Sequence, residues 1–463
     1  MTEPSTRHRV IDRLATVLEW ALGLRIAAAD VVQWLAQREG SLCVFPDTTI
    51  YWLLAGTIRD GAPYEVLEWG DAPHFALRTP GYPLFLALCR LLFGDRTLAV
   101  RLVQAGLGTL GVWLVSRLTA RVAPDRAGRC GWPTPLVAAA LAAFDPYVVA
   151  SSALILSEAV FVPLMLASLW GLAALWPGVD EASPPRRARS KALLTGVASG
   201  AAVLVRPSWA PAVPALLLAW VVAGGRGRRA AAARCSALVV LGAALAMAPW
   251  WARNARVFGR FVPTTLWMGA SLYDGLRPGA TGASDMRFLA DPDLRPLDEQ
   301  AQDAELRRRA WAFVREHPGR ALELAAIKLA RFWSPWPNAD AVRSPVVAAG
   351  RRDEGRGARG ESDRADTFRS PVVAAVSAAV TLPQFALLAL GGWDRRRDPR
   401  ALVLLAGPLL YFSALHMVFV GSVRYRIPAA VPAMGLAAIG FRRVLGAWEG
   451  RRRVEDDRQG EGG

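Results

Sequence analysis

Long apolar runs alternate with short basic clusters along most of the chain. Many runs approach the ~20 residues that an α-helix needs to cross ~30 Å of hydrocarbon. Ten candidate membrane spans follow, at residues 11–29, 97–117, 134–151, 154–176, 191–205, 208–224, 235–251, 370–391, 401–420 and 427–444. The pattern predicts an all-α polytopic membrane protein with about 10 transmembrane helices.

The basic clusters predict how the spans are oriented. Four connections carry four basic residues each, at 117–129, 186–191, 226–234 and 395–400. Because such clusters remain on the cytoplasmic side, we expect both termini in the cytoplasm and the two longest connections, about 30–96 and 252–369, outside. Residues 1–444 are then a polytopic transmembrane domain, and residues 445–463 a charged cytoplasmic tail.

The two outer segments are predicted to carry helices that lie on the membrane surface. Residues 48–59 give a helix with a broad apolar face that is too short to span. Further helices are expected at 299–316 and 320–333, separated by His317-Pro318. The segment 351–369 is rich in Gly, Arg, Asp and Glu and has too little apolar content to pack.

Composition narrows the partners. The chain is 53% hydrophobic, with 18 Trp and a net charge of +16. The positive residues stand at span boundaries, where they meet lipid headgroups, so membrane lipids rather than nucleic acid are the expected partners. The four Cys have no CxxC spacing, and the grouping of Glu68, Asp71 and His74 is of a kind that arises often by chance. No metal site is therefore assigned, although a divalent metal is left open as a cofactor.

Polar residues that a plain membrane anchor does not need gather at the predicted outer boundary. They are Asp47, Arg78-Thr79-Pro80-Gly81-Tyr82-Pro83, Ser157-Glu158, Arg206-Pro207, Pro249-Trp250 with Arg253-Asn254, and Arg424-Tyr425-Arg426-Ile427-Pro428.

These motifs, with Tyr51 after Asp47, resemble the C-type (GT-C) glycosyltransferases between about Phe45 and Ile439. The likeness is to bacterial relatives of the dolichyl-phosphate-mannose protein mannosyltransferases and of the lipid A aminoarabinose transferase. It implies surface helices that roof a cavity, a sugar donor carried on polyprenyl phosphate, and a place in the bacterial inner (plasma) membrane. Protein O-mannosyltransferases carry adjacent Asp and Glu in the first loop, whereas Thr48 follows Asp47 here, which weakens the case for a protein acceptor.

The chemistry of such a transfer fits these residue types. A sugar on polyprenyl phosphate leaves as a phosphate, so guanidinium groups rather than a protonated acid assist its departure. One carboxylate then suffices as the base, and our hypothesis gives this role to Asp47, with inversion at the anomeric carbon. The residues expected to bind the donor phosphate and sugar are Arg78, Tyr82, Tyr51, Arg206, Arg253, Arg424 and Arg426. Glu158 is the second candidate catalytic residue, either orienting an arginine, binding the sugar or assisting a metal.

Each assignment has a purely structural alternative. Asp47 can cap the helix that starts at Thr48, which contributes ~1 kcal/mol. Glu158 can pair with an arginine only to hold the fold, because a carboxylate between apolar neighbours needs a partner. Arg424 and Arg426 can reach toward headgroups. Tyr51 and Tyr82 can be interfacial aromatic residues, and Arg78 can pair with an acid of its own loop.

The predicted function is an inverting glycosyltransferase that moves a sugar from a polyprenyl-phosphate donor to an acceptor hydroxyl of a lipid, glycan or protein on the extracytoplasmic face. The main alternative is a lipid or small-solute transporter or flippase, and a third is a non-catalytic assembly scaffold. We find no inverted repeat in the sequence, and the polar residues gather at one surface, which disfavours transport.

Overall fold

The computed structural model describes residues 6–38, 46–67, 72–124, 132–176, 186–338 and 371–460. Within these ranges the chain is helical, and its only extended pairing is a single antiparallel bridge between Val66 and His74. The predicted all-α fold is confirmed. The polar segment 351–369 and the acids Glu68 and Asp71 lie outside the described residues.

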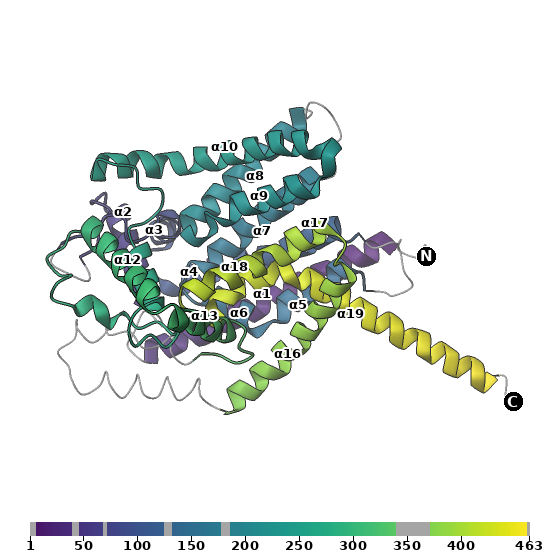
Figure 1. Ribbon diagram of the computed structural model, residues 1–463. Coiled ribbons are helices and arrows are strands. Elements are labelled where there is room, and N and C mark those ends of the chain that lie inside the picture. The colour runs from purple at the N-terminus through teal and green to yellow at the C-terminus, as the bar shows by residue number, and fades with distance from the viewer. Residues whose placement is uncertain are drawn as a thin grey trace.

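Helices of 3 to 38 residues form a bundle (Figure 1). Its members are α1 (Thr6–Arg38), α4 (Thr97–Val122), α5 (Thr134–Phe144), α6 (Pro146–Ala153), α7 (Glu158–Leu175), α8 (Arg186–Val205), α9 (Ala212–Ala223), α10 (Gly225–Phe258), α16 (Pro371–Asp394), α17 (Pro399–Ala401), α18 (Gly407–Val418) and α19 (Val423–Gly460). A π-helical segment, Leu402–Ala406, joins α17 to α18.

Among the described residues every predicted span falls mainly on helix, but the count of ten is not confirmed. Six helical segments are long and apolar enough to cross a membrane among the described residues, and the bent pair α5–α6 makes up to seven. The other three predicted spans fall on α1, α8 and α9. Of these, α9 has only 12 residues, and α1 carries charges along its length, including Asp12, Arg13 and Glu19. Because α9 is short and α1 is charged, neither has the long apolar stretch that by itself identifies a membrane span.

The bend of 57° between α5 and α6 leaves backbone groups without partners inside a helix. Buried side chains supply the missing hydrogen bonds. Asp145 caps α6 by accepting N–H bonds from Tyr147 and Val148, and Gln384 of α16 donates to its other oxygen at 2.9 Å. The guanidinium of Arg25, fully buried, donates to the carbonyls of Ala142 and Ala143. Arg25 thus supplies hydrogen-bond donors to backbone carbonyls at the break between α5 and α6. A carbonyl in apolar surroundings needs such a partner.

Glycines allow α8 and α10 to approach closely. A Cβ on Gly196 of α8 would lie 2.1 Å from the Val239 carbonyl oxygen of α10, and one on Gly242 would lie 2.2 Å from that of Leu193. Small residues of this kind let membrane helices pack backbone to backbone. This close contact holds α8 and α10 together within the bundle.

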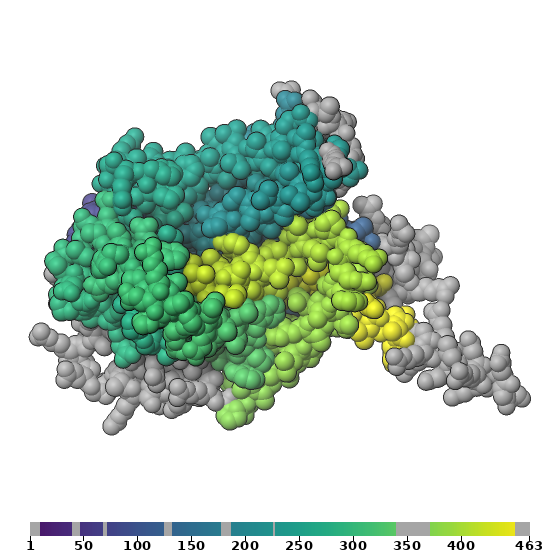
Figure 2. Space-filling model, viewed as in Figure 1, coloured from purple at the N-terminus to yellow at the C-terminus, as the bar shows by residue number. Residues whose placement is uncertain are grey.

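The outer helices cover one end of the bundle, while both termini lie at the other (Figure 1). They are α2 (Pro46–Arg59), α3 (Gly81–Phe93), α11 (Met268–Gly275), α12 (Glu299–Glu316) and α13 (Pro318–Phe332). Figure 2 shows α12 and α13 forming a continuous green cap on this end. The two predicted outer segments therefore meet on one side of the molecule.

The apolar face predicted for residues 48–59 is turned mainly toward protein. Ile50, Tyr51 and Leu54 are buried, whereas Leu53 is 51% exposed. On α13, by contrast, Leu322 is 74% exposed and Leu324, Lys328 and Phe332 are buried. The helix α2 is accordingly fixed against the bundle, and this fixes the place of the residues at its start.

Candidate active site

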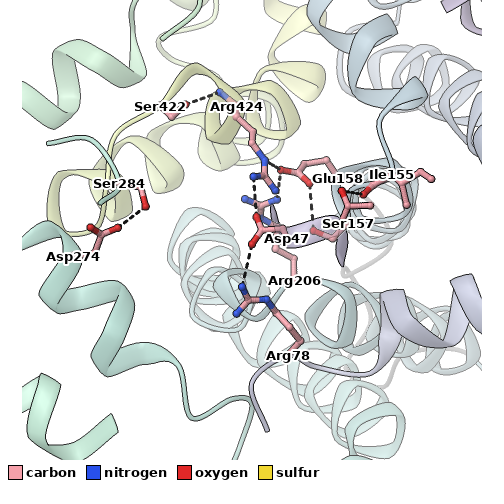
Figure 3. A network of polar contacts seen from close by, with 11 residues as sticks. Asp47, Arg78, Ile155, Ser157, Glu158, Arg206, Asp274, Ser284, Ser422 and Arg424 are labelled. Carbon is pink, nitrogen blue, oxygen red and sulfur yellow. Dashed lines mark hydrogen bonds and ion pairs between the residues drawn. The ribbon is translucent and has the colours of Figure 1, made fainter. Parts of the chain in front are cut away.

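Five charged side chains from five separate parts of the chain form one network at the capped end (Figure 3). They come from the start of α2, the loop before α3, the start of α7, the residue after α8, and the start of α19: Asp47, Arg78, Glu158, Arg206 and Arg424. All five were candidates from sequence, and the fold brings them together.

Asp47 lies between two guanidinium groups. Its Oδ1 is 3.1 Å from Nη2 of Arg78, and its Oδ2 is 2.9 Å from Nη1 of Arg424. Its side chain is 32% exposed. Burial raises the pKa of Asp47, but the positive charges of Arg424 and Arg78 outweigh this and hold that pKa below its usual value. The carboxylate is therefore ionised at neutral pH.

The capping alternative for Asp47 has a different geometry from the one observed. Asp47 is the second residue of α2 rather than the residue before it, and both of its oxygens are bound by arginines. A negative charge in the first turn still interacts favourably with the helix dipole. The side chain nevertheless points toward the network, as Figure 3 shows.

Glu158 binds two arginines through one oxygen. Its Oε1 lies 2.8 Å from Nε of Arg424 and 2.9 Å from Nη1 of Arg206, while Ser157 donates its hydroxyl to Oε2 at 3.3 Å. Only 2% of the side chain is exposed. The carboxylate therefore holds Arg424 and Arg206 in place, and Arg424 links both acids of the network.

The network has a positive excess. Three guanidinium groups and two carboxylates leave a net charge of +1, counted from the five residues of the network. Because their side chains are between 2% and 32% exposed, this charge is poorly screened by solvent. Such a site favours an anion of one or two charges with oxygens that can accept several N–H bonds.

Aromatic rings line the network. Arg78 lies 5.3 Å from the centre of the Trp267 ring and 5.9 Å from that of Tyr51, while Arg206 and Arg424 lie 5.5 and 5.8 Å from the Tyr425 ring. These cation–π contacts orient the guanidinium planes without consuming their N–H donors. The predicted Tyr51 is thus a neighbour of the network.

Three other predicted residues are not part of the network and form hydrogen bonds that hold the fold. Tyr82 is fully buried and donates its hydroxyl to Gln104 at 2.8 Å. Arg253 donates to the carbonyls of Phe75 and Tyr64. Arg426 is 5% exposed and donates to the carbonyls of Phe332 and Ser334 at 3.0 and 2.6 Å.

The opposed roles of Arg424 and Arg426 follow from helix geometry. Both belong to α19, which starts at Val423. Two residues correspond to about 200° around an α-helix, so their side chains leave opposite faces. The expectation that both hold one phosphate is not met by this arrangement, because Arg426 fastens α19 to the end of α13.

Short contacts of the backbone and side chains place the network. Thr48 donates its hydroxyl to the Ile155 carbonyl at 2.9 Å, tying α2 to the turn before Glu158. A Cβ on Gly81 would lie 2.6 to 2.8 Å from backbone atoms of Leu204 and Val205, so only glycine lets the loop that carries Arg78 reach the end of α8 beside Arg206.

A second polar cluster lies beside the network and was not found from sequence (Figure 3). Asp274 is buried and accepts bonds from the Ser284 hydroxyl and the Asp285 N–H at 2.7 and 2.8 Å. Burial raises its pKa to about 6. Lys328, also buried, donates to the carbonyls of Gly275 and Val418, and burial lowers its pKa to about 8. The Asp274 bonds join residues 10 and 11 positions apart, and the Lys328 bonds join residues 53 and 90 apart, so no short motif indicates them.

The side chains of the network are not the set of ligands that a metal site needs. Among the residues that the structure describes, no three His, Cys, Asp or Glu side chains come together to hold a cation. The two acids of the network instead face arginines, whose positive charges would repel a metal cation.

The segment 77–252 matches the family of dolichyl-phosphate-mannose-protein mannosyltransferases. The resemblance to the C-type glycosyltransferases is thus confirmed. The match includes Arg78, Glu158 and Arg206, whereas Asp47 and Arg424 lie outside it and join the network through the fold. No curated protein matches the chain by sequence.

Solved structures give the same fold. The apo oligosaccharyltransferase of Archaeoglobus fulgidus is 15% identical, with a TM-score of 0.57, and the alignment covers 96% of this chain and 52% of that one. The AglB of the same organism, in complex with an inhibitory peptide and a dolichol-phosphate, is 12% identical, with a TM-score of 0.50 and coverage of 95% and 52%. This chain therefore spans about half the length of these relatives.

An ArnT of Cupriavidus metallidurans bound to undecaprenyl phosphate is also similar. It is 16% identical, with a TM-score of 0.41, and the alignment covers 94% of this chain and 78% of that one. At that TM-score the likeness adds nothing to the assignment of the fold.

Proposed function

We propose that this protein is an inverting glycosyltransferase that moves a sugar from a polyprenyl-phosphate donor to an acceptor hydroxyl at the extracytoplasmic face of a membrane. The observation that carries the proposal is the position of Asp47 between Arg78 and Arg424, at 3.1 and 2.9 Å, in a network with a positive excess. The family match and the fold support the same class of reaction.

The donor is recognised by its charge. A polyprenyl phosphate that carries a sugar is a phosphodiester with one negative charge, which equals the net charge of the network. Arg78, Arg206 and Arg424 offer N–H groups that phosphate oxygens accept. When the phosphate binds to Arg78 and Arg424, these groups leave the Asp47 carboxylate, whose pKa then rises because its two positive neighbours are shared.

The transfer step then balances as follows. The acceptor oxygen attacks the anomeric carbon while its proton passes to Asp47. The bond between that carbon and the phosphate oxygen breaks, and its electron pair remains on the phosphate. The products are an inverted glycoside, a polyprenyl phosphate whose second charge the arginines stabilise, and a protonated Asp47 that returns its proton to water.

Glu158 has a supporting part in this scheme. Its Oε1 holds Arg424 and Arg206 at 2.8 and 2.9 Å, so it fixes the two guanidinium groups against each other. Of the three roles left open by the sequence, orienting arginines is the one its contacts favour. Arg253 and Arg426 contribute by holding outer segments, and Tyr82 by packing under Tyr51 at 4.9 Å between ring centres.

The sidedness of the site rests on charge and position. The basic residues of 186–191 and 226–234 lie at the starts of α8 and α10, those of 395–400 follow α16, and the termini lie at the end opposite to the network (Figure 1). Placing the basic connections in the cytoplasm puts the network outside.

The test is a comparison of cell-envelope glycans and lipids by mass spectrometry. Cells that lack the gene are complemented with the wild type or with Asp47→Asn. We expect one hexose, pentose or aminosugar to be missing from a glycoconjugate in the deletion strain and in the variant strain, and restored by the wild type. An unchanged set of glycoconjugates in all three strains excludes the transferase and favours a transporter.

A further inference from the structure

The loop that delivers Arg78 is held by a carboxylate from the other outer segment. Glu299, the first residue of α12, accepts the N–H of Phe75 on Oε2 at 2.7 Å. It also accepts the N–H of Ala76, at 2.9 Å on Oε1 and 3.1 Å on Oε2. The partners are 224 and 223 residues apart in sequence, and the Glu299 side chain is 3% exposed.

The carbonyl groups of the segment from Phe75 to Arg78 are also held by hydrogen bonds. Arg253 donates to the Phe75 carbonyl at 2.7 Å, and the Leu266 N–H donates to the Ala76 carbonyl at 3.0 Å. Tyr64 donates its hydroxyl to the carbonyl of Arg78 itself at 3.1 Å. With these bonds the N–H groups of Phe75 and Ala76 are on an acid, and the carbonyls of Phe75, Ala76 and Arg78 are on donors, which leaves this backbone little freedom.

Two residues beyond Ala76, the Arg78 side chain reaches Asp47. Leu77 between them is 1% exposed and packs with Ile50 and Leu54 of α2 in one apolar cluster. A shift of the segment would therefore change the distance between Arg78 and Asp47, and a displacement of about 1 Å can cost a site a factor of about 100 in rate.

Resting on the function proposed above, we infer that Glu299 is a positioning residue for the reaction, which sets Arg78 opposite Asp47 by receiving the N–H groups of Phe75 and Ala76. Its place at the start of α12 suits a negative charge, because the helix dipole is positive there. The second outer segment thereby controls the geometry of the phosphate site in the first.

The chain offers a matched control one helical turn away. Asp303 of α12 is 4% exposed and accepts the Gly269 N–H on Oδ1 at 2.6 Å, while its Oδ2 binds Arg307 at 2.8 Å. An asparagine at 303 keeps an oxygen for Gly269. Its NH₂ then faces Arg307, whose side chain is 37% exposed and can turn to solvent. A glutamine at 299 must turn an NH₂ toward one of two backbone N–H donors that have no such freedom, so this change alone opposes a donor to a fixed donor.

The experiment is a double-mutant cycle on the purified full chain, with farnesyl phosphate as the probe and its dissociation constant as the readout. Glu299→Gln is combined with Arg78→Ala, and Asp303→Asn is measured in the same two backgrounds. We expect Glu299→Gln to weaken binding about tenfold when Arg78 is present and less than about twofold when it is absent. Asp303→Asn should stay within about twofold in both.

The outcomes separate this inference from the proposed function. If Arg78→Ala weakens binding but Glu299→Gln does not, or weakens it equally in both backgrounds, Glu299 does not act through Arg78 and the inference fails alone. If Arg78→Ala leaves the affinity unchanged, the phosphate site itself fails and the inference with it. Glu299→Asp, which keeps the charge but is one methylene too short to reach both N–H groups, replaces the glutamine variant in the same cycle if that variant does not fold.

Discussion

The Nη1 atom of Arg424 lies 2.9 Å from Oδ2 of Asp47, although 377 residues separate the two in the chain. The pair joins the start of the last helix to the first outer segment. It also places the carboxylate that we propose as the base in direct contact with a guanidinium group that we propose to hold the phosphate. In this proposal Asp47 and the donor phosphate compete for Arg424. This competition gives the proposed reaction its order, because the donor must bind before the base is released.

Replacing Asp47 by Asn should separate binding from chemistry. Asparagine is a poor base, so we expect sugar transfer to fall by about 10² to 10⁴-fold. The same change removes the charge that competes for Arg78 and Arg424, so the affinity for farnesyl phosphate should be unchanged or tighter. Single-turnover transfer and equilibrium binding on the same preparation measure both. Transfer at the wild-type rate would end the assignment of Asp47 as the base.

Arg424→Ala and Arg426→Ala should differ in kind. Loss of a charged hydrogen-bond partner at Arg424 should weaken the binding of farnesyl phosphate by at least about tenfold, with the protein still monodisperse. Loss of Arg426 leaves the buried carbonyls of Phe332 and Ser334 without a donor, at a cost of about 1–3 kcal/mol each, and should lower the melting temperature instead. Equal effects of the two variants on affinity would contradict the division of roles.

The division between these arginines shows what the sequence can and cannot predict. Charge and span order predict that Asp47 and Arg424 lie at the same end of the bundle, because a membrane protein has only two ends. The motif around Arg424 does not show where the helix begins. Since α19 starts at Val423, the two arginines leave opposite faces, and only one reaches the network.

Contacts between distant segments account for the other differences. Arg253 and Tyr82 belong to motifs at the correct end of the bundle, but their side chains turn to backbone carbonyls and to Gln104. Glu299 begins a charged helix that the sequence predicts to lie on the membrane surface, and only its pairing with Phe75 and Ala76 distinguishes it. Helix positions thus follow from hydrophobic periodicity, whereas the direction of a polar side chain depends on packing.

Two neighbouring glycines of α16 should respond differently to alanine. A Cβ on Gly391 would lie 1.8 Å from the Leu436 carbonyl oxygen of α19, whereas one on Gly392 would meet no atom within 4 Å. Overpacking of this kind costs about 1–3 kcal/mol, so Gly391→Ala should lower the melting temperature and the yield. Gly392→Ala should leave both unchanged or slightly raised, since alanine favours helix. Thermal unfolding of the two variants in the same detergent checks this, and equal stability would mean that the helices do not cross there.

Stability should vary with pH through Glu299. Burial raises the pKa of Glu299 to about 7 from 4.5, against the opposing effect of the Phe75 and Ala76 N–H groups and of Arg253; His74 and Asp303 also face it. Between these two pH values the folded state binds more protons than the unfolded state. The contribution of this group to stability is therefore complete below about pH 4.5 and is lost as the pH rises through about 7.

Melting temperatures of the wild type and Glu299→Gln at pH 5 and pH 8 measure this effect of Glu299, because the glutamine cannot titrate. We expect the wild type to lose more than the variant over this interval, with Asp303→Asn as the control for the neighbouring acid. A wild type that gains stability relative to Glu299→Gln toward pH 8 would show that hydrogen bonds, rather than burial, dominate the charge state of Glu299.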